Sequence, residues 1–419
     1  MGLLKMMNTP KLATLLLSLS MFFVTIWHWG ADQCLVLLAI LALLYKPWRQ
    51  KIFCAKNFKS PITMVALLFF AWVIISTLII NTAHLPLQRA WYGVIMYDLM
   101  LYLLVLPCVI KNLKHCKWIE QGLILGVLIN VILSTFYHFN PDFTLAHLTY
   151  HPFNDGGFTD APFRDGVFDN NPLPLIFIVV LACWILLQRI LRKESHPIDI
   201  VIFIALSLYI WLINIERSGY LLYIALFLVA LYSQIIGRKG FFIGLLALTL
   251  MIACLYEGVP TVKYRTNKGA EDIASFWQNS HHFSNIDLTP GSFGTRLNFI
   301  YIGCDLIKSN PLAGTGSSGY PLVYSTYAKM KHLSLPLQSD NMYMLLAVEL
   351  GLIGLVLYLF WLGVIWHTIK NLSTTQGNAL RGLWWMIVIM NMTTSAFILS
   401  PIGGTFIVFL SLYTSKNEV

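Results

Sequence analysis

Long apolar segments recur along almost the whole chain, and they restrict its fold more than any other feature of the sequence. A helix needs about 20 consecutive apolar residues to cross the core of a bilayer. Segments close to this length follow one another here, and 57% of the 419 residues are apolar while only 11% are charged. Soluble domains carry roughly 25% charged residues. The sequence therefore predicts an all-α integral membrane protein with about twelve transmembrane helices and no separate soluble domain.

The predicted spans are separated by short polar loops, except for two long intervals. The first span has Lys5 and Lys11 ahead of it like a signal peptide, but residues 28–30 (His-Trp-Gly) are not a cleavage site, so a retained helix is expected. The second and the last spans are short enough to be tilted pairs or re-entrant segments. The predicted spans are roughly 12–27, 31–45, 61–80, 91–110, 118–138, 172–191, 198–214, 218–236, 240–256, 342–366, 380–398 and 400–414.

The distribution of Lys and Arg predicts the orientation, because cytoplasmic loops of membrane proteins are enriched in these residues. With the N-terminus inside, every inner loop is positive, and the short outer loops hold only Arg89, Arg164 and Arg217. Both termini are therefore expected in the cytoplasm. The inner loops hold 18 of the 28 Lys and Arg residues: Lys5, Lys11, Lys46, Arg49, Lys51, Lys56, Lys59, Lys111, Lys114, Lys117, Arg189, Arg192, Lys193, Arg238, Lys239, Lys370, Arg381 and Lys416.

The basic residues and the cysteines exclude two other classes of function. The net charge of +9 is spread over short loops between helices, so nucleic acid is not expected as a partner. The seven cysteines lie mostly within predicted helices or inner loops, and none forms a CxxC pair. Neither a disulfide nor a cysteine metal site is expected.

Two long outer intervals divide the chain. Residues 139–171 are acidic, with Asp155, Asp160, Asp165 and Asp169 as possible metal ligands, but their spacing fits no known calcium loop, and solvated carboxylates are the simpler interpretation. Residues 257–340 contain amphipathic pieces that predict short helices at the membrane surface. The expected division is therefore 1–256 with the first nine helices, 257–340 as the long loop, and 341–419 with the last three.

The segment from Thr289 to Leu359 contains the polar residues that carry chemistry. Arg296 follows a turn of glycine and serine, and Asn310-Pro311 with Gly314 and Gly316 comes about fifteen residues later. An Asp340-Asn341 pair then precedes the next apolar run, which contains Glu349-Leu350-Gly351. Further upstream, Arg217-Ser218-Gly219 opens another apolar run.

In order, spacing and flanks, these features resemble the O-antigen ligase/polymerase superfamily of membrane glycosyltransferases. The resemblance implies a fold of the GT-C-like kind, with the long periplasmic loop between the ninth and tenth helices. It also implies a donor glycan linked to undecaprenyl pyrophosphate. In bacteria with two membranes, the enzyme would lie in the inner membrane with its active site on the periplasmic side.

The resemblance implies that arginines bind the pyrophosphate of the donor. Arg217 and Arg296 stand at the corresponding places, and Arg89 resembles a third. Guanidinium groups hold phosphate oxygens with paired hydrogen bonds that lysine cannot reproduce. The alternative for Arg217 is an interface anchor paired with Glu216, and for Arg296 an ordinary surface charge. Asn341, Gly314 and Gly316 are expected to support the site.

Asp340 departs from the superfamily, whose ligases usually have a histidine before the asparagine. A carboxylate can also accept the proton of an acceptor hydroxyl, so Asp340 is the candidate catalytic base. The alternative is a helix N-cap, because Asp at a helix start accepts backbone N–H groups. The competing bases are His281, His282 and His332 in the same interval.

The sequence favours an O-antigen ligase that transfers polysaccharide to a sugar hydroxyl of lipid A–core. Membrane lipids are further partners, and no cofactor or metal is expected. An O-antigen polymerase with the same donor is the nearest alternative. A polysaccharide or lipid transporter is less favoured, because no internal repeat is present and only Asp98 and Glu349 are expected well within spans.

Overall fold

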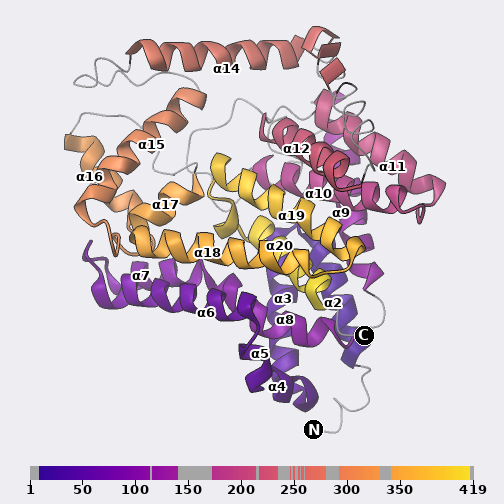
Figure 1. Cartoon of the computed structure of the whole chain (residues 1–419), viewed down its shortest axis with the longest axis horizontal. Helices are drawn as coiled ribbons and strands as arrows, with labels where there is room; N and C mark the ends of the chain where they lie inside the picture. The colour runs from indigo at the N-terminus through magenta and orange to yellow at the C-terminus, as the bar shows by residue number, and fades with distance from the viewer. Residues whose placement is uncertain are drawn as a thin grey trace.

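The computed structural model is built of helices packed into a bundle with one end extended (Figure 1). It describes residues 9–113, 116–139, 172–213, 217–234, 256–258, 260–279, 292–330 and 341–415, together with 246, 249–250 and 253–254. Within these residues the regular secondary structure is entirely helical. The all-α class predicted from the apolar segments is confirmed.

Several helices are suited to a membrane by length and hydropathy. Four single spans qualify in the described residues: Pro61–Ile80, Lys117–Phe136, Leu173–Leu191 and Gly351–Lys370. Two bent pairs could each be one further span, Trp29–Leu44 with Lys46–Ile52, and Leu87–Ile95 with Asp98–Ile110. Three shorter apolar helices lie at Thr9–Phe23, Pro197–Ile213 and Ser218–Tyr232.

Helix occupies each predicted apolar range that falls on described residues, whereas the predicted span 240–256 lies largely outside them. The helices up to the first long interval are α2 (Thr9–Phe23), α3 (His28–Leu44), α4 (Lys46–Ile52), α5 (Ala55–Phe58), α6 (Pro61–Ile74), η1 (Ile75–Ile80), α7 (Leu87–Ile95), η2 (Asp98–Leu101), α8 (Tyr102–Ile110) and α9 (Lys117–Phe139). Those that follow are α10 (Pro172–Leu191), α11 (Pro197–Leu208), η4 (Tyr209–Ile213), α12 (Arg217–Gln234), α14 (Pro260–Asn279), α15 (Ser292–Ser309), α16 (Tyr320–Met330), α17 (Met342–Glu349), α18 (Gly351–Lys370), α19 (Thr374–Thr393), η6 (Ala396–Ile398) and α20 (Ser400–Ser415).

The first helix packs closely on α9 because glycines remove side chains from the contact. A Cβ at Gly122 or Gly126 would collide with the backbone carbonyls of Ser18 and Phe22 on α2. Small residues four apart allow two membrane helices to approach at backbone distance. Asn130, one turn further along α9, donates to the Thr25 carbonyl. The α2–α9 pair is thus fixed by shape and by one buried hydrogen bond.

The centre of the molecule is formed by α10 and α20, whose side chains are buried along nearly their whole length. Trp184 on α10 donates from its indole N–H to the Ala379 carbonyl on α19, at 2.9 Å. A Cβ at Gly382 would overlap the Trp184 ring, so this glycine makes room for the indole. The C-terminal helix is therefore a core element.

One charged cluster joins four helices where α10 ends. Arg189 pairs with Glu120 on α9 at 2.8 Å and lies 3.8 Å from Asp199 on α11. The Tyr413 hydroxyl of α20 reaches the other Glu120 oxygen, at 3.5 Å. Burying an ion pair costs desolvation free energy. The net contribution of the Arg189–Glu120 pair to stability therefore depends on the additional contacts with Asp199 and Tyr413.

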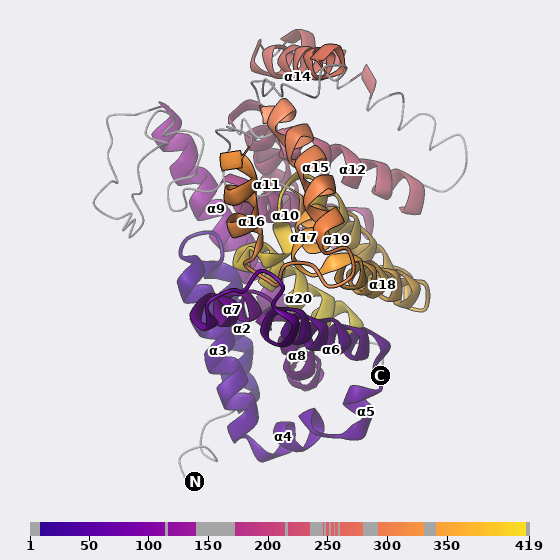
Figure 2. The same cartoon turned by 90° about the vertical axis from the view of Figure 1, so that its left-hand side faces the viewer.

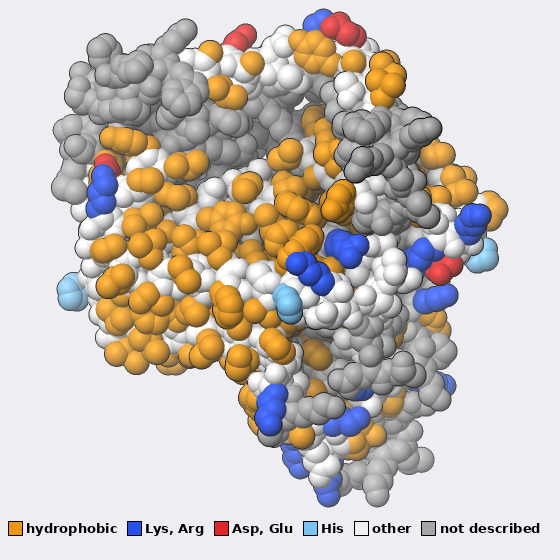
Figure 3. Space-filling view, in the orientation of Figure 1, with side chains coloured by type: hydrophobic (Ala, Val, Ile, Leu, Met, Phe, Trp, Pro, Cys, Tyr) orange, Lys and Arg blue, Asp and Glu red, His pale blue; other side chains and the backbone are white. Residues whose placement is uncertain are grey.

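The two ends of the molecule differ in composition. Figures 1 and 2 place α4 and α5 at one end and α14 at the opposite end. In Figure 3 hydrophobic side chains cover much of the visible face, and most of the visible Lys and Arg side chains lie along its lower and right-hand margin. Residues 257–340 contribute three described helices, and two of them, α14 with 20 residues and α15 with 18, are longer than the short helices expected there, while α16 has 11.

The predicted span 342–366 is wrong as a single helix. It divides into α17 and α18, because the backbone turns at Leu350 and Gly351 has a φ of 69°. Only the second part qualifies as a membrane span. Glu349 is therefore the last residue of a short helix just ahead of a span, and not a charge in the middle of one.

Candidate active site

A glycine-rich loop, residues 310–319, joins three distant parts of the chain. On one side it lies against the start of α18, where Leu352 N–H donates to the Pro311 carbonyl at 2.8 Å. On the same side, the N–H groups of Thr315 and Gly316 donate to the carbonyls of Val348 and Glu349, at 2.9 and 2.8 Å. The loop thus continues the hydrogen bonding that the break between α17 and α18 interrupts.

The other side of the loop contacts the segment from η1 to α7. Ser76 donates from its hydroxyl to the Ala313 carbonyl at 2.7 Å, and Thr77 accepts the N–H of Ser317 at 2.9 Å. The Ser317 hydroxyl donates to the Gly93 carbonyl at 2.9 Å. The loop is therefore held between two elements that are more than 200 residues apart in sequence from each other.

Two glycines permit this close packing. Gly314 has a φ of 71°, and a Cβ there would collide with the carbonyl group of Glu349. Gly351 also has positive φ, and its Cβ would meet the Leu312 carbonyl. Residues other than glycine rarely adopt such φ values, and here they would also lack space. Gly316, whose φ is 85°, belongs to the same turn, so the two glycines expected to support the site lie in this loop.

Arg89 lies in the first turn of α7 and contacts the loop directly. Its Nε donates to the Ser318 carbonyl at 3.1 Å, and the side chain is half-buried. No other protein group within the described part of the chain hydrogen-bonds to this guanidinium. Its two terminal nitrogens therefore remain available to an anion, which a guanidinium binds with paired hydrogen bonds.

Glu349 lies behind the same loop and is only 4% exposed. One carboxylate oxygen accepts the backbone N–H of Tyr320, the first residue of α16, at 3.2 Å. Burial raises the pKa of this carboxyl to about 7, while hydrogen bonds from the Tyr320 and Ser318 backbones and the charge of Arg89 act to lower it. The sequence analysis placed this residue within a span and gave it no role in the site.

Asn341 caps α17. Its side-chain oxygen accepts the Met344 N–H at 3.0 Å, and its amide N–H₂ donates to the Met392 carbonyl, at 3.2 Å, near the end of α19. The N-cap position considered for Asp340 is thus occupied by Asn341. Asp340 itself lies outside the described residues, immediately before this cap.

The other predicted site residues are described only in part. Arg217 is the first residue of α12 and Arg296 lies in the second turn of α15, so both stand near helix starts as expected, but nothing is described of their side chains. The helix α15 packs on α17, which brings its chain close to the cap at Asn341. His281, His282 and His332 lie outside the described residues, as do the acidic residues of 139–171.

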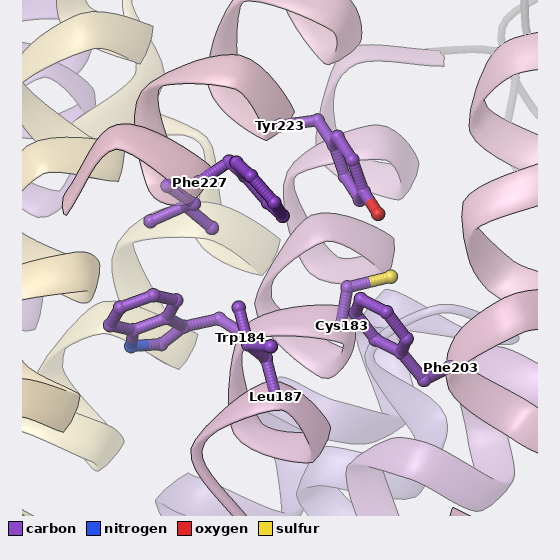
Figure 4. A pocket seen from close by; sticks show the side chains of 7 residues that line it. Cys183, Trp184, Leu187, Phe203, Tyr223 and Phe227 are labelled. Atoms are coloured by element: carbon purple, nitrogen blue, oxygen red, sulfur yellow. The ribbon is translucent and has the colours of Figure 1, made fainter. Parts of the chain in front are cut away.

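A narrow apolar cleft with a volume of about 10 Å³ lies between α10, α11 and α12, away from the loop (Figure 4). It is lined by Cys183, Trp184, Leu187, Phe203, Tyr223, Leu226 and Phe227. Its polar groups are a thiol and the Tyr223 hydroxyl, and that hydroxyl already lies 2.8 Å from Ser207 Oγ. The cleft has no charged side chain and is unsuited to a pyrophosphate, so the loop beside Arg89 is the better candidate site.

No three His, Cys, Asp or Glu side chains of the described residues come together as a metal site would require. The backbone amides of the loop already donate within the protein, so the donor that remains for an anion is the Arg89 guanidinium.

Comparison with known proteins finds one family that resembles part of the chain. Residues 200–359 match the family model described as O-antigen ligase. The match begins within α11 and ends within α18, so it includes Arg217, Arg296, the 310–319 loop, Asn341 and Glu349. No curated protein matches the chain significantly. Residues 200–359 are therefore similar to the O-antigen ligase family, as the spacing of the arginines, glycines and Asp-Asn pair indicated.

Proposed function

We propose that this protein is an O-antigen ligase. It would transfer polysaccharide from undecaprenyl pyrophosphate to a sugar hydroxyl of lipid A–core, without a metal ion, on the periplasmic face of the bacterial inner membrane. The family implies glycan transfer from a lipid-linked donor, for which membrane helices supply the access. The choice of a ligase over a polymerase rests on the compact length of the chain and its basic balance.

The observation that carries the proposal is the position of Arg89. Its Nε is fixed by the Ser318 carbonyl at 3.1 Å, while its terminal nitrogens are free to bind an anion. The charge that develops on a departing pyrophosphate is stabilised by donors fixed before the reaction begins. Arg217 and Arg296, at the starts of two further helices, are proposed to complete the set that binds the donor.

The acceptor hydroxyl also needs a base, and Asp340 is proposed for this role. It precedes Asn341, whose side chain is held by hydrogen bonds with α17 and α19. A base must lie within hydrogen-bond reach of the proton that it removes, so a rigid neighbour is an advantage. An ordinary Asp has a pKa near 3.9 and is ionised at neutral pH.

The deciding experiment is the lipopolysaccharide profile of a strain from which the gene is deleted. A ligase predicts loss of the polysaccharide ladder to bare core, together with accumulation of carrier-linked polymer. A polymerase predicts core that carries a single repeat unit. An unchanged ladder, with the wild-type protein shown to be produced in the parent strain, would exclude both.

A further inference from the structure

The glycine-rich loop beside Arg89 already contains an anion that belongs to the protein. Backbone N–H groups in a tight turn and at a helix start commonly bind phosphate or carboxylate ligands. Here the Glu349 carboxylate takes that place, accepting the Tyr320 N–H at 3.2 Å and hydrogen-bonding to the Ser318 backbone. These N–H groups are therefore occupied from within the protein, which leaves the Arg89 guanidinium as the donor available to an external anion.

Glu349, Ser318 and Arg89 form one continuous series of contacts. The backbone of Ser318 hydrogen-bonds to the carboxylate, and its carbonyl accepts the Arg89 Nε at 3.1 Å. Ser318 has a φ of 65°, a left-handed conformation that residues other than glycine rarely adopt. The direction of its carbonyl thus requires support from outside the loop, and the buried carboxylate provides it.

The negative charge of Glu349 does not serve stability. The groups that face it are Arg89 from α7, the Tyr97 ring between α7 and η2, and the loop backbone. Its pKa of about 7 in the folded protein exceeds the value of about 4.3 for an unfolded chain. The folded state therefore binds more protons in this interval, and stability falls as the pH rises from about 4.3 through 7. A glutamine would occupy the same space without this cost.

We propose that Glu349 is a positioning residue: its buried carboxylate holds the 314–319 loop and, through Ser318, aims the Arg89 guanidinium at the pyrophosphate of the donor. The assignment of the ligand as a pyrophosphate rests on the proposed function. The position of the Glu349 carboxylate inside the loop, and its effect on the loop, do not depend on that proposed function.

The first test compares wild type, Glu349→Gln and the exposed control Glu194→Gln at pH 8, where the Glu349 carboxyl is mostly charged. Inorganic pyrophosphate is the probe, and its affinity is measured by calorimetry on the purified protein. Glu349→Gln should bind it on the order of tenfold more weakly and show a higher KM for the lipid-linked donor. Its Tm should equal or exceed that of wild type, whereas a merely structural role would lower the Tm.

The second test empties the carboxylate site with Glu349→Ala and adds formate at pH 8. Formate should raise the Tm of this variant and partly restore pyrophosphate binding, because it can accept the Ser318 and Tyr320 N–H groups. Formamide, of the same size but neutral, also accepts these N–H groups and should raise the Tm, but it should not restore pyrophosphate binding, and wild type should respond to neither compound. If the alanine variant does not fold even with formate, the Glu349→Gln comparison decides.

These outcomes separate the two proposals. Formate-specific rescue of pyrophosphate binding in a protein that transfers no glycan would overturn the proposed function and leave the positioning role in place. Pyrophosphate affinity and donor KM at wild-type values in Glu349→Gln would overturn the positioning role, even if glycan transfer is normal. Equal rescue of pyrophosphate binding in Glu349→Ala by formate and by formamide would also overturn it.

Discussion

At the scale of single residues, the three arginines are proposed to act through hydrogen-bond geometry and not through charge alone. Arg89 shows why, because its Nε already donates to Ser318 while its terminal nitrogens have no hydrogen-bond partner among the described residues. Lysine has one ammonium group, which cannot hold the loop carbonyl and a ligand oxygen in the same arrangement. The same reasoning is proposed for Arg217 and Arg296.

We therefore expect Arg89→Lys, Arg217→Lys and Arg296→Lys each to lose most glycan transfer. The loss of one donor to a developing charge costs roughly 2.7–4 kcal/mol, or about a hundred- to a thousandfold in rate. Arg192→Lys is the matched control, because Arg192 pairs with Glu194 in an exposed loop between α10 and α11. Initial rates on purified variants measure the effect. Near-normal rates in all three variants would show that these arginines are only surface anchors and do not bind the donor.

Asp340 is expected to have a chemical role, and Asn341 a structural one. Asp340→Asn preserves shape but cannot accept a proton, so it should be nearly inactive with an unchanged Tm, and Asp340→His should be partly active. Asn341→Ala should lose about 1 kcal/mol of stability, because the α17 cap is removed. The measurements are transfer rates and thermal unfolding of each variant. Near wild-type transfer by Asp340→Asn would move the search for the base to His281, His282 and His332.

At the scale of elements, glycines determine which helices can touch. Gly126→Ala should destabilise the protein, because its Cβ would collide with the Phe22 carbonyl, and backbone on α2 cannot move as a flexible side chain can. Gly363→Ala is the control within a helix, since nothing lies within 4 Å of its Cβ. Alanine is favoured over glycine in a helix by roughly 0.5–1 kcal/mol, so the control should be neutral or stabilising. Thermal unfolding of both variants in detergent tests this, and equal Tm values would contradict it.

The sequence predicted helices better than it predicted their interruptions. Apolar length alone located α6, α9 and α10 to within a few residues, because a bilayer sets that length. The break at Leu350 falls inside an apolar run, where hydropathy gives no signal, and only Gly351 marks it. A glycine in an apolar helix is ambiguous unless its φ is known.

The candidate site was predictable in its residue types but not in its assembly. The glycines of the 310–319 loop and the arginines were found from their spacing, yet Arg89 was the weakest of them and Glu349 was read as a charge within a span. Arg89 and Glu349 are brought together at the loop by hydrogen bonds between residues 76–97, 310–320 and 348–353. Contacts at such separations are not encoded in local periodicity, and the capping role of Asn341 likewise appears only in the fold.

At the scale of the whole molecule, the loop and the basic inner segments should lie on opposite sides of the membrane. The span Pro61–Ile80 starts after the basic residues of α4 and α5 and ends just before the segment that contacts the glycine-rich loop. The Lys and Arg count predicts that α4 is cytoplasmic. If so, Arg89 and the loop face the periplasm, where the proposed acceptor is present.

Thiol labelling of intact spheroplasts tests this orientation. Cys54 is exposed beside α4, so a membrane-impermeant reagent should modify it only after the membrane is opened. Cys116 is buried and would be protected on either side, so it cannot report the orientation. Ala270→Cys, at an exposed position of α14 and placed in a cysteine-free background, should react in intact spheroplasts because α14 belongs to the outer interval. Labelling of Cys54 from outside, with Ala270→Cys protected, would invert the topology and place the proposed site in the cytoplasm, where a periplasmic ligase cannot act.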